Sequence, residues 1–224
     1  MGDIIGQLLP VALGIAISPI PIIASILMLM SPRARTTSFG FLLGWLVGIA
    51  LVVCVFTALS SILPSSGEGG SAPIRGGIQL LLGVLLLIIA VKQWRARPRE
   101  GAEVAMPKWM RRIDDMTFLP AAGLALLLAA VNPKNLLLGA SAGTTLGATD
   151  LSVAELSGFI AVFTLVAGCT VLLPVVGFLV ASARLRGPLN RMRDWLQQEN
   201  PVIMAVLLLV LGVVVVSKGL TALM

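Results

Sequence analysis

Two short polar segments interrupt long apolar runs in this sequence, and the first of them carries a charge. The segment "AVNPKNLLLG", residues 130–139, contains Asn132, Pro133, Lys134 and Asn135. A lysine in apolar surroundings is costly unless a partner supplies negative charge. An ammonium group of this kind binds carboxylate, phosphate or sulfate groups. The segment is therefore the first candidate for a binding function.

The second segment, "AISPIPIIAS" at residues 16–25, contains Ser18, Pro19 and Pro21. Serine and asparagine are favoured N-caps, because the side-chain oxygen accepts a hydrogen bond from a free backbone N–H. Proline is favoured at the next position, where its missing N–H is no loss. Ser18-Pro19 and Asn132-Pro133 therefore each predict the start of a helix in the middle of an apolar run.

Helices that restart in this way expose unpaired N–H groups and the positive end of a dipole. Lys134 adds a full positive charge, and the nearest acidic residues in the sequence, Asp115 and Asp150, only flank its apolar run. We therefore hypothesise that a ligand supplies the negative charge. The candidate substrate-binding residues are Ser18, Pro19, Pro21, Asn132, Pro133, Lys134 and Asn135. Two alternatives remain, a plain proline kink at each segment and a Lys134 side chain that reaches the membrane interface.

The elements that carry these residues are predicted from composition. The chain is 58% hydrophobic and 12% charged, with a mean hydropathy of +1.02, and a membrane span needs about 20 apolar residues. We expect an all-α polytopic membrane protein with six transmembrane helices, of which spans 1 and 4 are broken. The expected spans are 4–30, 39–63, 74–94, 117–146, 153–182 and 201–221. Residues 4–30 lack the basic start of a signal peptide, so we expect them to be retained as a span.

The two halves of the chain follow a similar plan. An offset of 114 residues pairs Pro19 with Pro133, Ser18 with Asn132, and Gly44 with Gly158. Three spans in each half make the second half run through the membrane upside down, as in the inverted repeats of many transporters. We therefore predict a first repeat at 1–94, a basic cytoplasmic loop at 95–116 and a second repeat at 117–224.

The basic residues predict the orientation in the membrane. Thirteen lie in the loops after spans 1, 3 and 5, whereas the other side has only Arg75 and Lys218. By the positive-inside rule these loops are cytoplasmic and both termini lie outside. The +6 net charge is thus explained by topology, and no nucleic-acid partner is expected. The thirteen residues are Arg33, Arg35, Lys92, Arg95, Arg97, Arg99, Lys108, Arg111, Arg112, Arg184, Arg186, Arg191 and Arg193.

Residue types argue against an enzyme. The chain has no histidine, so zinc sites with histidine and Ser-His or Cys-His nucleophile pairs are not expected. No ATP-binding loop and no cofactor motif is present, so we expect no cofactor and no metal. Six-span thiol carriers place cysteine beside proline in spans 1 and 4, where this chain has Ser18 and Asn132. Cys54 and Cys169 are expected to pack as small apolar residues.

The six-span plan with a polar-proline break in spans 1 and 4, and "NPK" in the second break, resembles the LysE superfamily of small exporters. Within that superfamily the chain is most similar to the mycobacterial GAP family of peptidoglycolipid-addressing and sulfolipid-addressing proteins. The shared features are "LPVALGIAISPIPIIASILML" near the N-terminus, "FLLGWLVGIALV" in span 2, "AVNPKNLLL" in span 4 and the basic central loop. This resemblance covers nearly the whole chain and implies export of glycolipids across the bacterial inner membrane toward the cell surface.

We therefore expect a transporter of an anionic lipid or glycolipid, whose headgroup binds at the paired half-helix starts and Lys134. The alternative is an exporter of a small amino-acid-like or anionic solute at the same site. The expected partners are membrane lipids or a glycolipid substrate, with envelope lipid export machinery and a homodimer as further candidates. Gly44 and Gly48 form a G-x-x-x-G pair, which supports either dimerisation or packing within the monomer.

Overall fold

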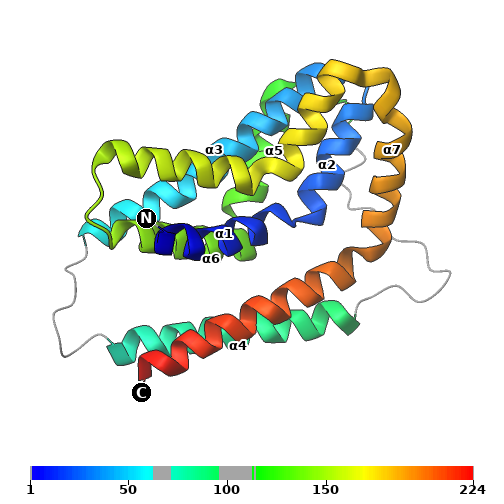
Figure 1. The fold of residues 1–224 in the computed structure, drawn as a ribbon. Helices are drawn as coiled ribbons and strands as arrows, with labels where there is room; N and C mark the ends of the chain where they lie inside the picture. The colour runs from blue at the N-terminus through cyan, green and yellow to red at the C-terminus, as the bar shows by residue number, and fades with distance from the viewer. Residues whose placement is uncertain (1, 63–71, 96–112, 114, 224) are drawn as a thin grey trace. The chain divides into compact units, whose positions relative to one another are not determined.

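The computed structural model describes residues 2–62, 72–95, 113 and 115–223, and the regular elements of these ranges are all α-helices (Figure 1). Most of the predicted loop 95–116 lies outside the described residues. The helices are α1 (Gly2–Ala16), α2 (Pro19–Met30), α3 (Ala34–Ile62), α4 (Ala72–Arg95), α5 (Phe118–Ala130), α6 (Pro133–Gly147) and α7 (Val153–Leu223).

The chain forms two compact units. The first comprises Met1–Ile62 and Ala105–Trp195, and the second comprises Leu63–Val104 and Leu196–Met224. The first unit therefore contains α1, α2, α3, α5, α6 and most of α7, whereas the second contains α4 and the end of α7. Each unit combines helices from both predicted repeats. Both polar segments lie in the first unit.

Helix α3 forms much of the core of the first unit. Its buried face contains Phe41, Trp45 and Ile49, which are at most 2% exposed. The same helix packs against α5 through small residues. A Cβ atom on Gly44 would overlap the backbone of Ala122, and one on Gly48 would lie 2.6 Å from Cβ of Ala129. The G-x-x-x-G pair thus serves packing within the chain, which is one of the two predicted roles.

Helix α6 uses glycines in the same way on its side of α3. Gly139, Gly143 and Gly147 recur every four residues, so they lie on one face of the helix. A Cβ atom at these positions would lie 2.6 Å from Val52 Cγ1, Val53 O and Thr57 O of α3, respectively. Close packing on both sides fixes α5 and α6 against one helix. The break between α5 and α6 is therefore held by a shared scaffold.

The structure contains several helices that are able to cross a membrane. By length and composition, Ala34–Ser60, Val153–Val180 and Pro201–Thr221 each qualify. The pairs α1 with α2 and α5 with α6 also qualify if each bent pair counts as one span, which raises the number from three to as many as five. The predicted span 74–94 falls within α4. The chain is thus a multi-pass membrane protein whose described elements are helices.

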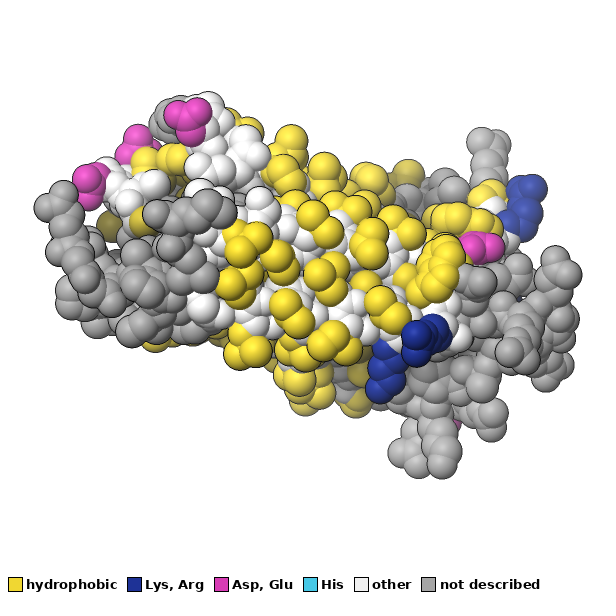
Figure 2. Space-filling model, turned by 90° about the horizontal axis from the view of Figure 1, so that it is seen from below, with side chains coloured by type: hydrophobic (Ala, Val, Ile, Leu, Met, Phe, Trp, Pro, Cys, Tyr) yellow, Lys and Arg dark blue, Asp and Glu magenta, His cyan; other side chains and the backbone are white. Residues whose placement is uncertain are grey.

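Outward-facing side chains of these helices suit a lipid environment. A row on α3 that recurs every four residues is 39–51% exposed and entirely apolar, and it consists of Leu43, Val47, Leu51 and Val55. Figure 2 shows many hydrophobic side chains exposed on one face of the molecule. Exposed apolar area of this extent marks a surface that contacts lipid or protein.

Candidate functional site at the two broken helices

Both polar segments interrupt a helix where the sequence predicted. Helix α1 ends at Ala16 and α2 begins at Pro19, with a bend of 54° between them. Helix α5 ends at Ala130 and α6 begins at Pro133, with a bend of 68°. In each case the proline occupies the first turn of the new helix, where its missing N–H leaves no donor unpaired. The predicted half-helices are confirmed.

The caps of the two new helices differ. The side-chain oxygen of Asn132 accepts a hydrogen bond of 3.0 Å from the backbone N–H of Lys134, as an N-cap should. Ser18 holds the N-cap position of α2 but makes no such bond. Its hydroxyl instead donates to the carbonyl of Ile15, 2.7 Å away. The capping role predicted for the Ser18 side chain is therefore wrong, because the hydroxyl serves the end of α1 rather than the start of α2.

Lys134 connects the two breaks. Its side chain is 3% exposed, and its ammonium nitrogen donates to three oxygens at the first break. These are the carbonyls of Gly14 at 2.7 Å and Ile17 at 3.0 Å and the hydroxyl of Ser18 at 2.7 Å. An ammonium group has three N–H donors, so all three are used. A cation at the end of α1 also meets the negative pole of that helix.

The carbonyls freed at the end of α1 are therefore paired. Besides the bonds from Lys134, the carbonyl of Ala16 accepts from the Ser18 N–H at 2.9 Å and from the Thr170 hydroxyl of α7 at 2.7 Å. Sequence reasoning missed both Thr170 and these carbonyls. A hydroxyl inside an apolar run was the available signal for Thr170, but a threonine in a membrane helix usually bonds to its own helix.

Asn135 also contacts both sides of the second break and reaches the first. Its side-chain nitrogen donates to the carbonyl of Leu128, near the end of α5, at 3.2 Å. Its side-chain oxygen accepts from the Ser18 hydroxyl at 3.5 Å, at the limit for a hydrogen bond. Asn135 is 2% exposed and Ser18 is 2% exposed. Ser18, Lys134 and Asn135 thus form one buried polar cluster, which we call the break cluster.

The helix starts offer fewer N–H donors than a typical helix. Pro19, Pro21 and Pro133 have no N–H, and the N–H of Lys134 is occupied by its cap. In the first turns of α2 and α6, the backbone N–H groups of Ile20 and Asn135 are the ones without a described hydrogen bond. Any anion at the breaks would therefore meet two N–H groups and the Lys134 ammonium.

The predicted site residues differ in burial. The break cluster is buried, and Pro19 and Pro21 are buried beside it. Asn132 is half-buried, whereas Pro133 is exposed. Pro133 therefore acts on the backbone at the start of α6 rather than through contacts in the cluster.

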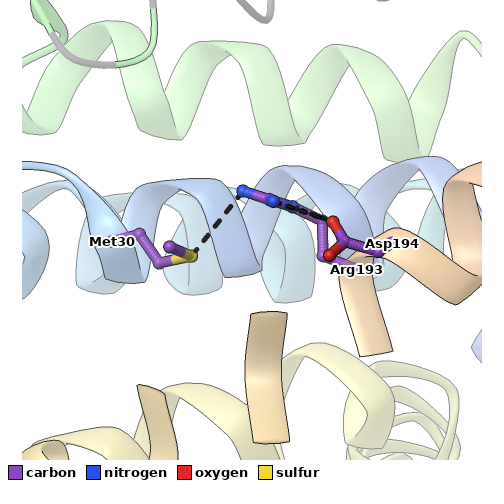
Figure 3. A network of polar contacts seen from close by, with 3 residues as sticks. All are labelled: Met30, Arg193 and Asp194. Atoms are coloured by element: carbon purple, nitrogen blue, oxygen red, sulfur yellow. Dashed lines mark hydrogen bonds and ion pairs between the residues drawn. The ribbon is translucent and has the colours of Figure 1, made fainter. Parts of the chain in front are cut away.

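No described carboxylate pairs with Lys134. The ion pair within the described ranges joins Arg193 and Asp194, with nitrogen and oxygen 2.7 Å apart. Arg193 also donates weakly to the sulfur of Met30, 4.0 Å away (Figure 3). Met30 ends α2, about 16 Å along the helix from its start, so this contact joins α7 to the far end of α2. Within the same ranges, no group of three or more His, Cys, Asp or Glu residues is arranged to hold a metal ion.

Most of the chain, including this site, matches a known protein family. The family model described as Sap, sulfolipid-1-addressing protein, matches residues 8–221. This range includes both breaks and every residue of the break cluster. No curated protein and no solved structure matches the chain.

Proposed function

Because the chain belongs to the sulfolipid-1-addressing protein family, we propose that it moves an anionic lipid or glycolipid from the inner membrane toward the cell surface. Family membership gives it a role in lipid addressing or transport, and its apolar helices agree with a multi-pass membrane protein. We propose three further points, namely that the lipid moves outward, that its headgroup binds at the breaks, and that the lipid is anionic.

A single observation carries the proposed site. Lys134 is 3% exposed, and its described partners are all neutral oxygens. A charge within a membrane span costs at least about 2.5 kcal/mol, and such residues usually serve a function. An anionic headgroup would supply the balancing charge. The positive starts of α2 and α6 and the N–H groups of Ile20 and Asn135 would add further attraction.

Headgroup binding has to compete with the bonds that Lys134 already makes. Charge-assisted hydrogen bonds are roughly twice as strong as neutral ones, so a sulfate or phosphate is able to draw the ammonium away from neutral carbonyls. In this proposal the structure represents the unloaded state. Loading also requires the breaks to open, because so little of Lys134 is exposed.

A six-span inverted repeat, which we propose for this chain, would allow such opening. The three unbroken candidate spans and the two bent pairs give five spans if each bent pair counts as one, and α4 would be the sixth. Predicted spans 1, 2, 4 and 5 belong to the first unit, and spans 3 and 6 belong to the second. Corresponding spans of the two repeats thus fall together, as a pseudo-twofold arrangement requires. Rocking of repeats around a central site is a common transport mechanism.

The remaining predictions form part of the same proposal. The basic loops would lie in the cytoplasm and both termini outside, following the positive-inside rule. We propose no enzymatic activity, and we propose envelope lipid export machinery as the receiver of the lipid. A homodimer through Gly44 and Gly48 is not proposed, because these glycines pack against α5.

The second candidate function is export of a small anionic or amino-acid-like solute, in keeping with the resemblance to LysE-type exporters. Two free N–H groups and one ammonium suit a single small anionic group. They do not by themselves require acyl chains. Both candidates share the chemistry of the site, so the experiment must distinguish the source of the anion.

Native mass spectrometry of the purified protein in detergent tests the proposal. The wild type is compared with Lys134→Ala, and Lys92→Ala serves as a matched control because it removes an exposed lysine of α4. We expect an anionic lipid or glycolipid on the wild type and on Lys92→Ala but not on Lys134→Ala. An empty wild type that takes up small carboxylates would favour the solute exporter. Equal lipid retention by all three proteins would refute the headgroup role of Lys134.

A further inference from the structure

We propose that the oxygens which hold the Lys134 ammonium become a binding site for a monovalent alkali cation when Lys134 turns toward an anionic headgroup. This inference rests on the proposed function, since it concerns the loaded state of the same site. The oxygens are the carbonyls of Gly14 and Ile17 and the hydroxyl of Ser18, which we call the α1 oxygens. Sodium or potassium ions would thus be bound together with the lipid.

The α1 oxygens already surround one cationic centre. They lie 2.7, 3.0 and 2.7 Å from the Lys134 nitrogen. Carbonyl and hydroxyl oxygens are the ligands that alkali cations use when they shed water. Unwound carbonyls and the C-terminal ends of half-helices form such sites in transporters. The ammonium of Lys134 therefore occupies a position that has the chemistry of a cation site.

The hydroxyl of Ser18 is oriented to accept rather than to donate at this centre. Its single proton is directed to the carbonyl of Ile15, at 2.7 Å, with Asn135 as a weaker acceptor at 3.5 Å. Its lone pairs therefore face Lys134. All three α1 oxygens are acceptors, so the centre attracts cations and repels anions. The headgroup must therefore bind the ammonium after Lys134 has turned away from this centre.

Departure of Lys134 would leave these acceptors without partners. A buried polar group without a hydrogen bond is costly, and inside a membrane no bulk water replaces the lost partner. The α1 oxygens also lie at the negative pole of α1, which favours a positive occupant over a neutral one. A small cation restores both the missing contacts and the charge. Because the three oxygens carry no net charge, they would also release the cation readily when Lys134 returns.

This exchange couples the two ligands. The headgroup favours the state in which the α1 oxygens are free, and the cation binds only that state. By thermodynamic reciprocity, each ligand must then raise the affinity for the other. A higher concentration of the cation on the loading side would thus favour lipid loading.

Lys134→Met tests the cation site without any lipid, because it removes the ammonium and leaves the α1 oxygens empty. Thermal unfolding of the full chain in detergent is followed in sodium, potassium and choline chloride at equal ionic strength. We expect sodium or potassium to raise the Tm of Lys134→Met by about 3–6 °C over choline at ten times the dissociation constant. The wild type should show no such difference, and Ser18→Ala combined with Lys134→Met should lose most of it. The same Tm for Lys134→Met in all three salts would overturn the proposal.

A second measurement uses the wild type, in case Lys134→Met does not fold. Binding of phosphatidylglycerol to the protein in detergent is compared with binding of phosphatidylcholine in the same three salts. We expect sodium or potassium to tighten phosphatidylglycerol binding at least about threefold over choline, through the coupling described above. Unchanged or weaker binding would overturn the cation site. Failure of the proposed function looks different, because Lys134→Ala would then retain the anionic lipid in every salt.

Discussion

The side-chain nitrogen of Lys134 lies 2.7 Å from the hydroxyl oxygen of Ser18, although 116 positions separate the two residues in the chain. This hydrogen bond joins the break in the first bent helix pair to the break in the second. The bonds from the same nitrogen to Gly14 and Ile17 make Lys134 the cap of α1. Any movement that separates the two breaks must therefore exchange the partners of this ammonium, and the first two predictions follow from that.

Replacement of Lys134 by methionine should destabilise the unloaded protein by about 2 kcal/mol, because each of three buried hydrogen bonds in a membrane protein contributes roughly 0.6 kcal/mol or more. For a chain of this length the Tm should fall by about 4–8 °C, measured by tryptophan fluorescence in choline chloride. Lys92→Met, at an exposed site, should leave the Tm within about 1–2 °C. A Lys134→Met protein as stable as the wild type would mean that the three bonds contribute nothing net.

Ser18 and Lys134 should be energetically coupled. A double-mutant cycle with Ser18→Ala and Lys134→Met should give an interaction free energy of about 1 kcal/mol, since contacting residues in one hydrogen-bond network show coupling of about 0.5–3 kcal/mol. Ser25, whose hydroxyl bonds only to Ile22 in its own helix, provides the control cycle. The cycle of Ser25→Ala with Lys134→Met should be additive within about 0.5 kcal/mol. Additivity in both cycles would contradict a direct contribution from the Ser18 contact.

Asn132→Ala should cost about 1 kcal/mol, the usual value of an N-cap, because the Asn132 side chain accepts from the Lys134 N–H. Asn132→Ser should restore most of the loss, since serine also caps. Denaturant or thermal unfolding measures both variants. Ser18→Asn should bring no matching gain at α2, because that position makes no capping bond.

Gly44→Ala should lower the stability of the protein by far more than the addition of one methyl group suggests. The added Cβ atom would overlap the backbone of Ala122, so α5 would have to move away from α3, and we expect a loss of more than about 2 kcal/mol. Gly123 in α5 has nothing within 4 Å of its Cβ position. Gly123→Ala should therefore stabilise the helix by up to about 1 kcal/mol. The test is a comparison of the two Tm values, in which Gly44→Ala should be the lower. A lower Tm for Gly123→Ala would refute the close packing of α3 against α5.

The proposed orientation predicts which side of the membrane each loop occupies. In a Cys54→Ala/Cys169→Ala background, a membrane-impermeant maleimide added to intact cells should label Asp150→Cys and leave Arg35→Cys unlabelled. Both positions are exposed, so burial does not explain a difference. Permeabilised cells should allow both to react. Labelling of Arg35→Cys in intact cells would reverse the topology derived from the positive-inside rule.

Much of the fold follows from the sequence because its signals are local or compositional. The breaks at Pro19 and Pro133 were predicted within one residue, since proline lacks a donor and asparagine caps the next turn. Apolar runs of about 20 residues predicted the helices of a multi-pass membrane protein. Family resemblance was readable for the same reason, because its motifs are short and contiguous.

The candidate site was predictable only in part. Sequence reasoning identified Ser18, Lys134 and Asn135 and expected the two breaks to be partners. It considered the positive starts of the new helices and overlooked the free carbonyls at the end of the old one, Gly14 and Ile17. The Ser18 hydroxyl was predicted to cap α2 because capping rules consider only the residues that follow the N-cap position. These rules do not consider the carbonyls that precede it.

The sequence by itself determined that the chain forms apolar helices, where two of them break, and that a lysine lies at one break. The tertiary structure decided which oxygens receive that lysine, because its partners lie at the end of α1 and in the break that follows it, more than 115 positions away. It also decided that Gly44 packs against α5 rather than against another chain. Hydrogen bonds in a helix reach four residues along the chain, whereas the burial of Lys134 depends on the packing of whole helices around α3.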